Sequence, residues 1–98
     1  MNLFTHVREI LIEVLKELSA QSVLPIDTDF SNITVEPPKD TRHGDMSTNA
    51  AMVLSKSVEV KPRELAQIIS EALSPKEIIS SVDIGGPGFI NITLSNFS

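Results

Sequence analysis

The sequence offers few side chains with the types and spacing that catalysis requires. His43 and Asp45 come nearest to a general acid–base pair, in which an imidazole and a carboxylate exchange protons. Gly44 between them marks a turn, however, and Asp residues in turns usually bond their own backbone. His6 lies far from His43 and the chain has no cysteine, so no zinc-ligand spacing is present. We expect a structural role for residues 43–45, and a small enzyme built around them is the least favoured alternative.

A second set of side chains could bind a nucleic-acid base. Period-two alternation places Phe89, Asn91 and Thr93 on one face of a predicted strand. An aromatic ring offers a flat platform for a base, and an amide presents a donor and an acceptor to a base edge. The alternative is that Phe89 forms a small second cluster or covers a sheet edge. The alternation alone leaves both interpretations open.

Charge is distributed unevenly along the chain. The net charge of −5 at pH 7 argues against a protein that holds nucleic acid by charge alone. Five of the eight basic residues nevertheless lie between positions 39 and 63: Lys39, Arg42, Lys56, Lys61 and Arg63. We interpret Lys39, Arg42 and Lys56 as candidate phosphate contacts. The alternative is a solvated loop followed by a helix start.

The first segment predicts an amphipathic helix over residues 3–20. Its apolar side chains recur at steps of three and four, which places them on one face: Leu3, Val7, Ile10, Leu11, Val14, Leu15 and Leu18. Asn2 can cap the start of the helix. The ladder of Glu9, Glu13 and Glu17 repels mildly at this spacing, so the helix must be stabilised by packing.

The middle of the chain predicts short elements. After a connecting loop over residues 21–32, residues 33–36 alternate apolar and polar, and two prolines then end a short strand. We expect residues 46–47 to form a brief second strand, after a polar turn. Ser47 or Thr48 then caps a short helix that continues to Lys56.

The last third predicts a helix and a hairpin. Pro62 fits the first helical position, and Ser74 with Pro75 ends the helix. Residues 82–84 and 89–94 alternate on either side of a turn rich in glycine. The aliphatic side chains of the final strand should face the helices: Ile90, Ile92 and Leu94.

Length and composition set the class of protein. Ninety-eight residues make one domain, over residues 1–98, and 41% of them are hydrophobic. No stretch approaches the roughly 20 apolar residues that span a bilayer. The order helix, two strands, two helices, two strands predicts a two-layer α+β fold, with helices on one face of a mainly antiparallel sheet. We expect a cytoplasmic domain with no membrane or DNA partner, and with no cofactor or metal of its own.

Three segments, in order, resemble the N-terminal domain appended to arginyl-tRNA synthetases. The first runs from Val35 through two prolines, then His-Gly-Asp at 43–45 and Thr-Asn-Ala at 48–50. The second is Pro-Arg-Glu-Leu-Ala at 62–66, and the third is Gly-Pro-Gly-Phe-Ile-Asn at 86–91. The resemblance covers essentially the whole chain.

The resemblance implies a role in binding tRNA. Such domains dock on the outer corner of the L-shaped tRNA, where the D-loop lies; Phe89 would stack on a D-loop base and Asn91 would hydrogen-bond it. The implied partners are an arginine tRNA and a catalytic domain of the same chain. Catalytic and anticodon-binding domains, with ATP and magnesium, are expected beyond Ser98, since the His-x-Gly-His signature is not in this sequence. The alternative is an acidic protein–protein interaction domain with no RNA role.

Overall fold

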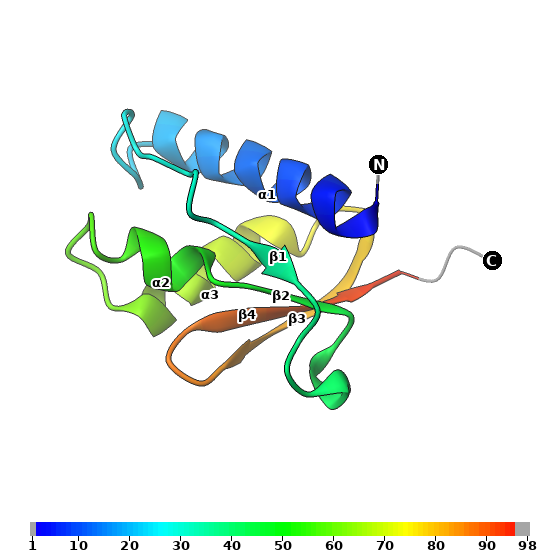
Figure 1. Ribbon diagram of the computed structural model, residues 1–98. Coiled ribbons are helices and arrows are strands. Elements are labelled where there is room, and N and C mark those ends of the chain that lie inside the picture. Colours follow the sequence, from blue (N-terminus) through cyan, green and yellow to red (C-terminus); the bar gives the residue numbers. More distant parts are fainter. Residues whose placement is uncertain (1, 96–98) are drawn as a thin grey trace.

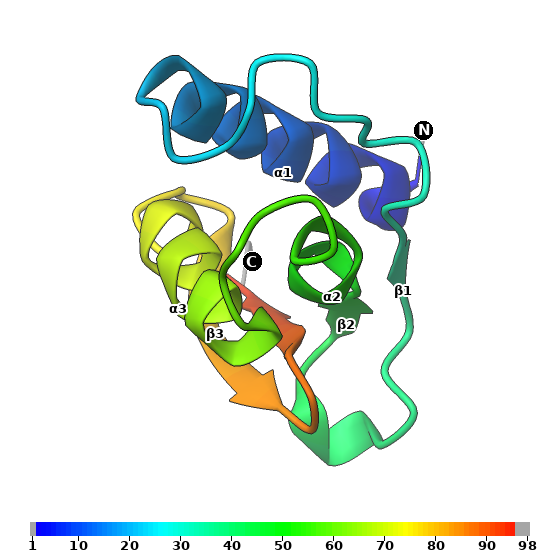
Figure 2. The ribbon, with the colours of Figure 1, turned by 90° about the vertical axis from the view of Figure 1, so that its left-hand side faces the viewer.

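The computed structural model describes residues 2–95, and Ser98 therefore lies outside the described residues. The elements are α1 (Leu3–Ala20), β1 (Val35–Glu36), a 3₁₀ turn η1 (Thr41–His43), β2 (Met46–Thr48), α2 (Ala50–Leu54), α3 (Pro62–Leu73), β3 (Ile79–Gly85) and β4 (Phe89–Leu94). The strands form one antiparallel sheet in the order β1-β2-β4-β3. Figures 1 and 2 show the three α-helices on one side of this sheet. The predicted α+β class and order of elements are confirmed.

Helix α1 forms where its apolar stripe predicts. The Asn2 side chain caps it, accepting a hydrogen bond of 2.8 Å from the Thr5 backbone N–H. The buried residues are Val7, Leu11, Val14, Leu15 and Leu18. The prediction is wrong for Leu3, which is 56% exposed, because the buried stripe begins only at Val7.

The loop after α1 is held along the helix by Arg8. Its Nε donates to the Ile33 carbonyl at 2.9 Å, and its Nη2 donates to the Phe30 carbonyl at 3.0 Å. The Ile33 N–H bonds Phe30, and the Thr34 N–H bonds the Asn49 side chain at 2.8 Å. These two N–H groups are therefore not available to a sheet, and β1 is shorter than the predicted 33–36.

Helix α2 is also shorter than predicted. The predicted cap is wrong, because Ser47 and Thr48 both belong to β2 and the N-cap residue is Asn49. The Thr48 hydroxyl nevertheless accepts a hydrogen bond of 3.2 Å from the Ala50 N–H. Asn49, which directly precedes the helix, uses its side chain on the strand side, accepting from Thr34 and donating to the Asn32 carbonyl at 3.3 Å. The start of α2 is thus tied to the chain that enters β1.

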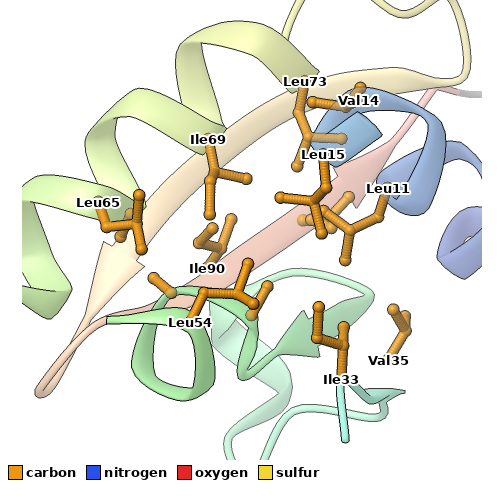
Figure 3. Close-up of a cluster of buried hydrophobic side chains, with 14 of the residues drawn as sticks. Leu11, Val14, Leu15, Ile33, Val35, Leu54, Leu65, Ile69, Leu73 and Ile90 are labelled. Carbon is orange, nitrogen blue, oxygen red and sulfur yellow. The ribbon is translucent and has the colours of Figure 1, made fainter. Parts of the chain in front are cut away.

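The hydrophobic core lies between the helices and the sheet. Figure 3 shows side chains from α1, α2, α3, the strands and the loop before β1 converging there. Pro62 stands in the first turn of α3, as predicted. The aliphatic face of β4 is confirmed, since Ile90 and Ile92 are fully buried and pair with Ile84 and Val82 of β3.

The His-Gly-Asp segment fastens β2 to β4. The Asp45 N–H donates to the Ile92 carbonyl at 2.8 Å, and the Asp45 carboxylate accepts from the Leu94 N–H at 2.7 Å. Gly44 has φ +98°, and a Cβ on it would lie 2.8 Å from the Ile92 oxygen. The expected structural role is confirmed, although Asp45 bonds a strand 49 positions away and not its own backbone.

Gly44→Ala should destabilise the fold strongly. A methyl group at this position combines a backbone conformation nearly restricted to glycine with a clash against β4, so we expect a loss of roughly 3 kcal/mol in the free energy of unfolding. Gly86→Ala is the matched control, because Gly86 (φ +51°) has only an ordinary 3.9 Å contact to Phe89 and should lose about 1 kcal/mol. Denaturant unfolding measures both; equal losses would contradict the fastening role.

Candidate nucleic-acid interface

The pairing of the strands creates one polar row across the face of the sheet that is turned away from the helices. The register aligns Glu36, Ser47, Asn91 and Asp83, one from each strand. The neighbouring row holds residues that point into the core, including the fully buried Ile90. Since successive residues of a strand point to opposite faces, the core leaves the polar row free for other uses.

A pocket of about 300 Å³ lies on this outer face. One wall is the chain that follows β1, with Pro37, Pro38 and Lys39, and the opposite wall is the tip of the β3–β4 hairpin. Phe89 and Asn91 both line it. Three of the five residues predicted to bind RNA therefore meet in one hollow: Lys39, Phe89 and Asn91.

Phe89 is half-buried and stands at the hairpin end of the pocket. It pairs with Gly85, which has no side chain to cover the ring from the neighbouring strand. Among the described residues, the core cluster and the apolar side chains packed against it do not include Phe89. Within the described structure, Phe89 therefore belongs to the pocket lining and not to the core cluster.

The Asn91 amide is positioned by a glycine. A Cβ on Gly85 would lie 2.9 Å from the Asn91 Nδ2 atom, so the amide group lies over the bare backbone of Gly85. Within residues 2–95 the Asn91 side chain forms no hydrogen bond. Its donor and its acceptor are both available to a group that enters the pocket.

The hairpin tip is fixed against the start of α3. A Cβ on Gly88 (φ +138°) would lie 3.0 Å from the Pro62 Cβ atom, so the two backbones approach closely. The Arg63 guanidinium donates a hydrogen bond to the Gly86 carbonyl. Sequence reasoning missed this contact, because it joins residues 23 positions apart that no local pattern relates.

The other two predicted cations do not themselves line the pocket, although Asp40, which binds Arg42, and His43, which follows it, both do. Arg42 is bound to Asp40 through a hydrogen bond of 2.6 Å between Nη2 and Oδ2, and its side chain is 85% exposed. Lys56 is exposed in the connection between α2 and α3 and does not line the pocket. Lys39 is exposed and belongs to the pocket wall.

The Asp40–Arg42 ion pair lowers the pKa of the Asp40 carboxyl. Hydrogen bonds from the Arg42 side chain, and then from its backbone N–H, lower the pKa of the Asp40 carboxyl from 3.8 to about 2. Asp40 also caps η1 through this backbone bond of 2.9 Å. The carboxylate cancels much of the Arg42 charge locally, which weakens Arg42 as a contact for phosphate.

Neither a metal site nor a membrane span is found in the part of the chain that the structure describes. Residues 2–95 contain no group of three histidine or acidic side chains arranged to hold a metal ion. None of the helices formed by these residues is long and apolar enough to cross a bilayer.

Comparison with known proteins identifies related sequences. The family model described as "Arginyl tRNA synthetase N terminal domain" matches residues 5–94. The chain is 48% identical over 94 residues to the arginine–tRNA ligase of Ruegeria sp. (strain TM1040), covering 96% of this chain and 16% of that protein. It is 52% identical over 93 residues to that of Rhodopseudomonas palustris (strain HaA2), covering 95% and 16%. The chain therefore spans about one sixth of the length of these curated relatives.

The Asp40 carboxyl should titrate with a midpoint near pH 2. Its pKa is lower in the folded protein than in the unfolded chain, so the carboxylate stabilises the fold above about pH 4. This contribution is lost as the pH falls toward 2. Arg42→Ala should move the midpoint up toward 3.8, which NMR titration of the side-chain carboxyl carbon would detect. An unshifted midpoint in the unsubstituted protein would disprove the ion pair.

Proposed function

We propose that this chain docks an arginine tRNA through the pocket on the outer face of its sheet. The chain belongs to the arginyl-tRNA synthetase N-terminal domain family, and the proposal starts from that fact. The observation that carries this proposal is the meeting of Phe89, Asn91 and Lys39 in that pocket. An aromatic ring, an unbonded amide and a cation supply stacking, hydrogen bonding and phosphate contact in one place.

The ligand chemistry favours an unpaired base of RNA. Sequence-specific proteins read RNA mostly at loops, whose bases can be turned outward, stacked on aromatic rings and hydrogen-bonded at their edges. The resemblance to the family indicates a base of the D-loop, at the outer corner of the tRNA. Phe89 would stack on this base, Asn91 would bond its edge, and Lys39 would neutralise a neighbouring phosphate.

The chemistry of the whole protein would take place outside this chain. We propose an arginine–tRNA ligase in which a separate catalytic domain uses ATP and magnesium to attach arginine to its tRNA in the cytoplasm. The module described here would bind the tRNA and help to hold its acceptor end at that distant site. Its partners are the tRNA and the catalytic domain of the same protein.

Phe89→Ala should weaken tRNA binding with little change in folding. Loss of a stacking platform costs roughly 1–3 kcal/mol of binding free energy, whereas loss of a core phenylalanine would cost roughly 3–5 kcal/mol of stability. Ile26→Ala is the control, because Ile26 is 93% exposed and lies in the loop after α1. Fluorescence titration with an arginine tRNA transcript measures affinity, and thermal unfolding measures stability. A large fall in melting temperature, with unchanged affinity per folded molecule, would reject the platform.

Asn91→Ala should reduce discrimination among D-loop bases. The amide can match the donors and acceptors of some base edges and not others, so binding of transcripts with each of the four bases at the contacted position should differ for the unsubstituted protein. The four affinities should converge in the variant. An equal loss for all four transcripts would show that Asn91 does not read a base.

A further inference from the structure

We propose that Lys61 and Arg63 form a second phosphate-binding site, beside the hairpin tip, for the backbone of the RNA strand whose base enters the pocket. This inference rests on the proposed function. It assigns to the start of α3 a role that the pocket residues alone do not supply. The ligand is the phosphodiester backbone, which is recognised by charge and not by sequence.

The two residues are adjacent to the pocket wall. Pro62, which stands between them, approaches Gly88 closely, and Arg63 bonds Gly86 on the same turn. Figure 1 shows the hairpin turn next to the start of α3. Since Gly86 lines the pocket, the Arg63 contact places the guanidinium next to the hairpin wall, and Lys61 directly precedes Pro62 at the same end of α3.

Neither the Lys61 charge nor the Arg63 charge is held in an ion pair within the described structure, although Arg63 lines a second hollow together with Glu71 and Asp83. Among the described residues, the ion pairs involve Arg42 with Asp40 and Lys76 with Glu17, and neither Lys61 nor Arg63 has such a partner. Arg63 uses one N–H on the Gly86 carbonyl, which leaves other donors of the five in a guanidinium. The adjacent Glu64 points about 100° away around the helix.

The carboxylates of the outer face determine where phosphates can lie. Asp83 is aligned directly with Asn91, and Glu36 lies beyond Ser47 in the same row. These negative groups repel phosphates from the middle of the sheet but can accept hydrogen bonds from a base. The backbone on the two sides of an inserted base should therefore follow the margins, with Lys39 on one side and Lys61 with Arg63 on the other.

Arg63 has a second effect in this arrangement. By holding the Gly86 carbonyl it fixes the turn that carries Phe89, so it is also a positioning residue for the platform. If Arg63 had only a structural role, its substitution would lower affinity without changing the salt dependence of that affinity. A phosphate contact changes how steeply affinity falls as salt rises, because each neutralised phosphate releases counterions.

Lys61→Gln tests the site with little risk to folding, since Lys61 is exposed and without an ion pair in the described structure. We expect the slope of log affinity against log salt, measured with an arginine tRNA transcript between about 50 and 200 mM, to become shallower by about 0.7. Lys16→Gln is the matched control: it removes the same charge from an exposed position on α1. Its slope should equal that of the unsubstituted protein. Equal slopes for Lys61→Gln and Lys16→Gln would overturn the proposal for Lys61.

Arg63→Gln and Arg63→Lys separate the two effects of Arg63. Arg63→Gln should weaken affinity and flatten the slope, whereas Arg63→Lys should weaken affinity but keep the slope, because charge remains and the guanidinium geometry is lost. A weaker affinity of Arg63→Gln at unchanged slope would overturn the phosphate role of Arg63. Phe89→Ala in the same assay separates the proposal for the pocket from the proposal for the second site. If Phe89→Ala lowers affinity while the salt slopes of Lys61→Gln and Arg63→Gln stay unchanged, the second site is rejected and the pocket is retained. If Phe89→Ala has no effect either, the proposed function fails as well.

Discussion

The attachment of β2 to β4 by Gly44 and Asp45 is the constraint on which the rest of the outer face depends. Strand β2 has only three residues, Met46–Thr48, too few for its own ladder to define a register securely. The Asp45 carboxylate adds a bond to the Leu94 N–H, and the glycine allows the chain to lie against Ile92. A slip of β2 by one residue would turn Ser47, which lines the pocket, into the core and the buried Met46 out of it. Fold and pocket therefore share one determinant.

Stability and binding are divided between the two faces of the sheet. The helix side holds the buried aliphatic cluster. Hydrogen bonds from the Arg8 side chain to the Ile33 carbonyl, and from the Thr34 N–H to the Asn49 side chain, hold the adjoining loop in place. The outer side contributes little apolar burial, so an aromatic ring and an unbonded amide can remain there without weakening the core. Two glycines of the hairpin allow close contacts, one on each face of the sheet. Gly85 leaves space for the Asn91 amide on the outer face, and Gly88 allows the turn to pack against Pro62 at the start of α3.

Sequence periodicity predicted those parts of the fold that depend on neighbours along the chain. Alternation identified the faces of β4, and steps of three and four identified α1 and α3. What periodicity could not predict are contacts between distant positions: Asp45 with Leu94, Asn49 with Thr34, and Arg63 with Gly86. The bond between Asn49 and Thr34 explains why β1 begins later than expected. The observed contacts also change the interpretation of the cations, because Arg42 is paired locally while Arg63 stands beside the pocket.

A net charge of −5 does not prevent a protein from binding RNA if the negative groups lie far from the phosphates. The ladder of Glu9, Glu13 and Glu17 belongs to α1, which Figure 1 places on the helix side of the sheet. The described part of the molecule measures 39 × 25 × 21 Å, while charges in physiological salt are screened beyond about 8 Å. A strand bound on the outer face would therefore respond chiefly to Glu36, Lys39 and Asp40, which line the pocket. At the hairpin margin it would respond to Asp83 and to the proposed contacts Lys61 and Arg63. The local arrangement of charge, and not its sum, decides whether the face attracts a phosphate backbone.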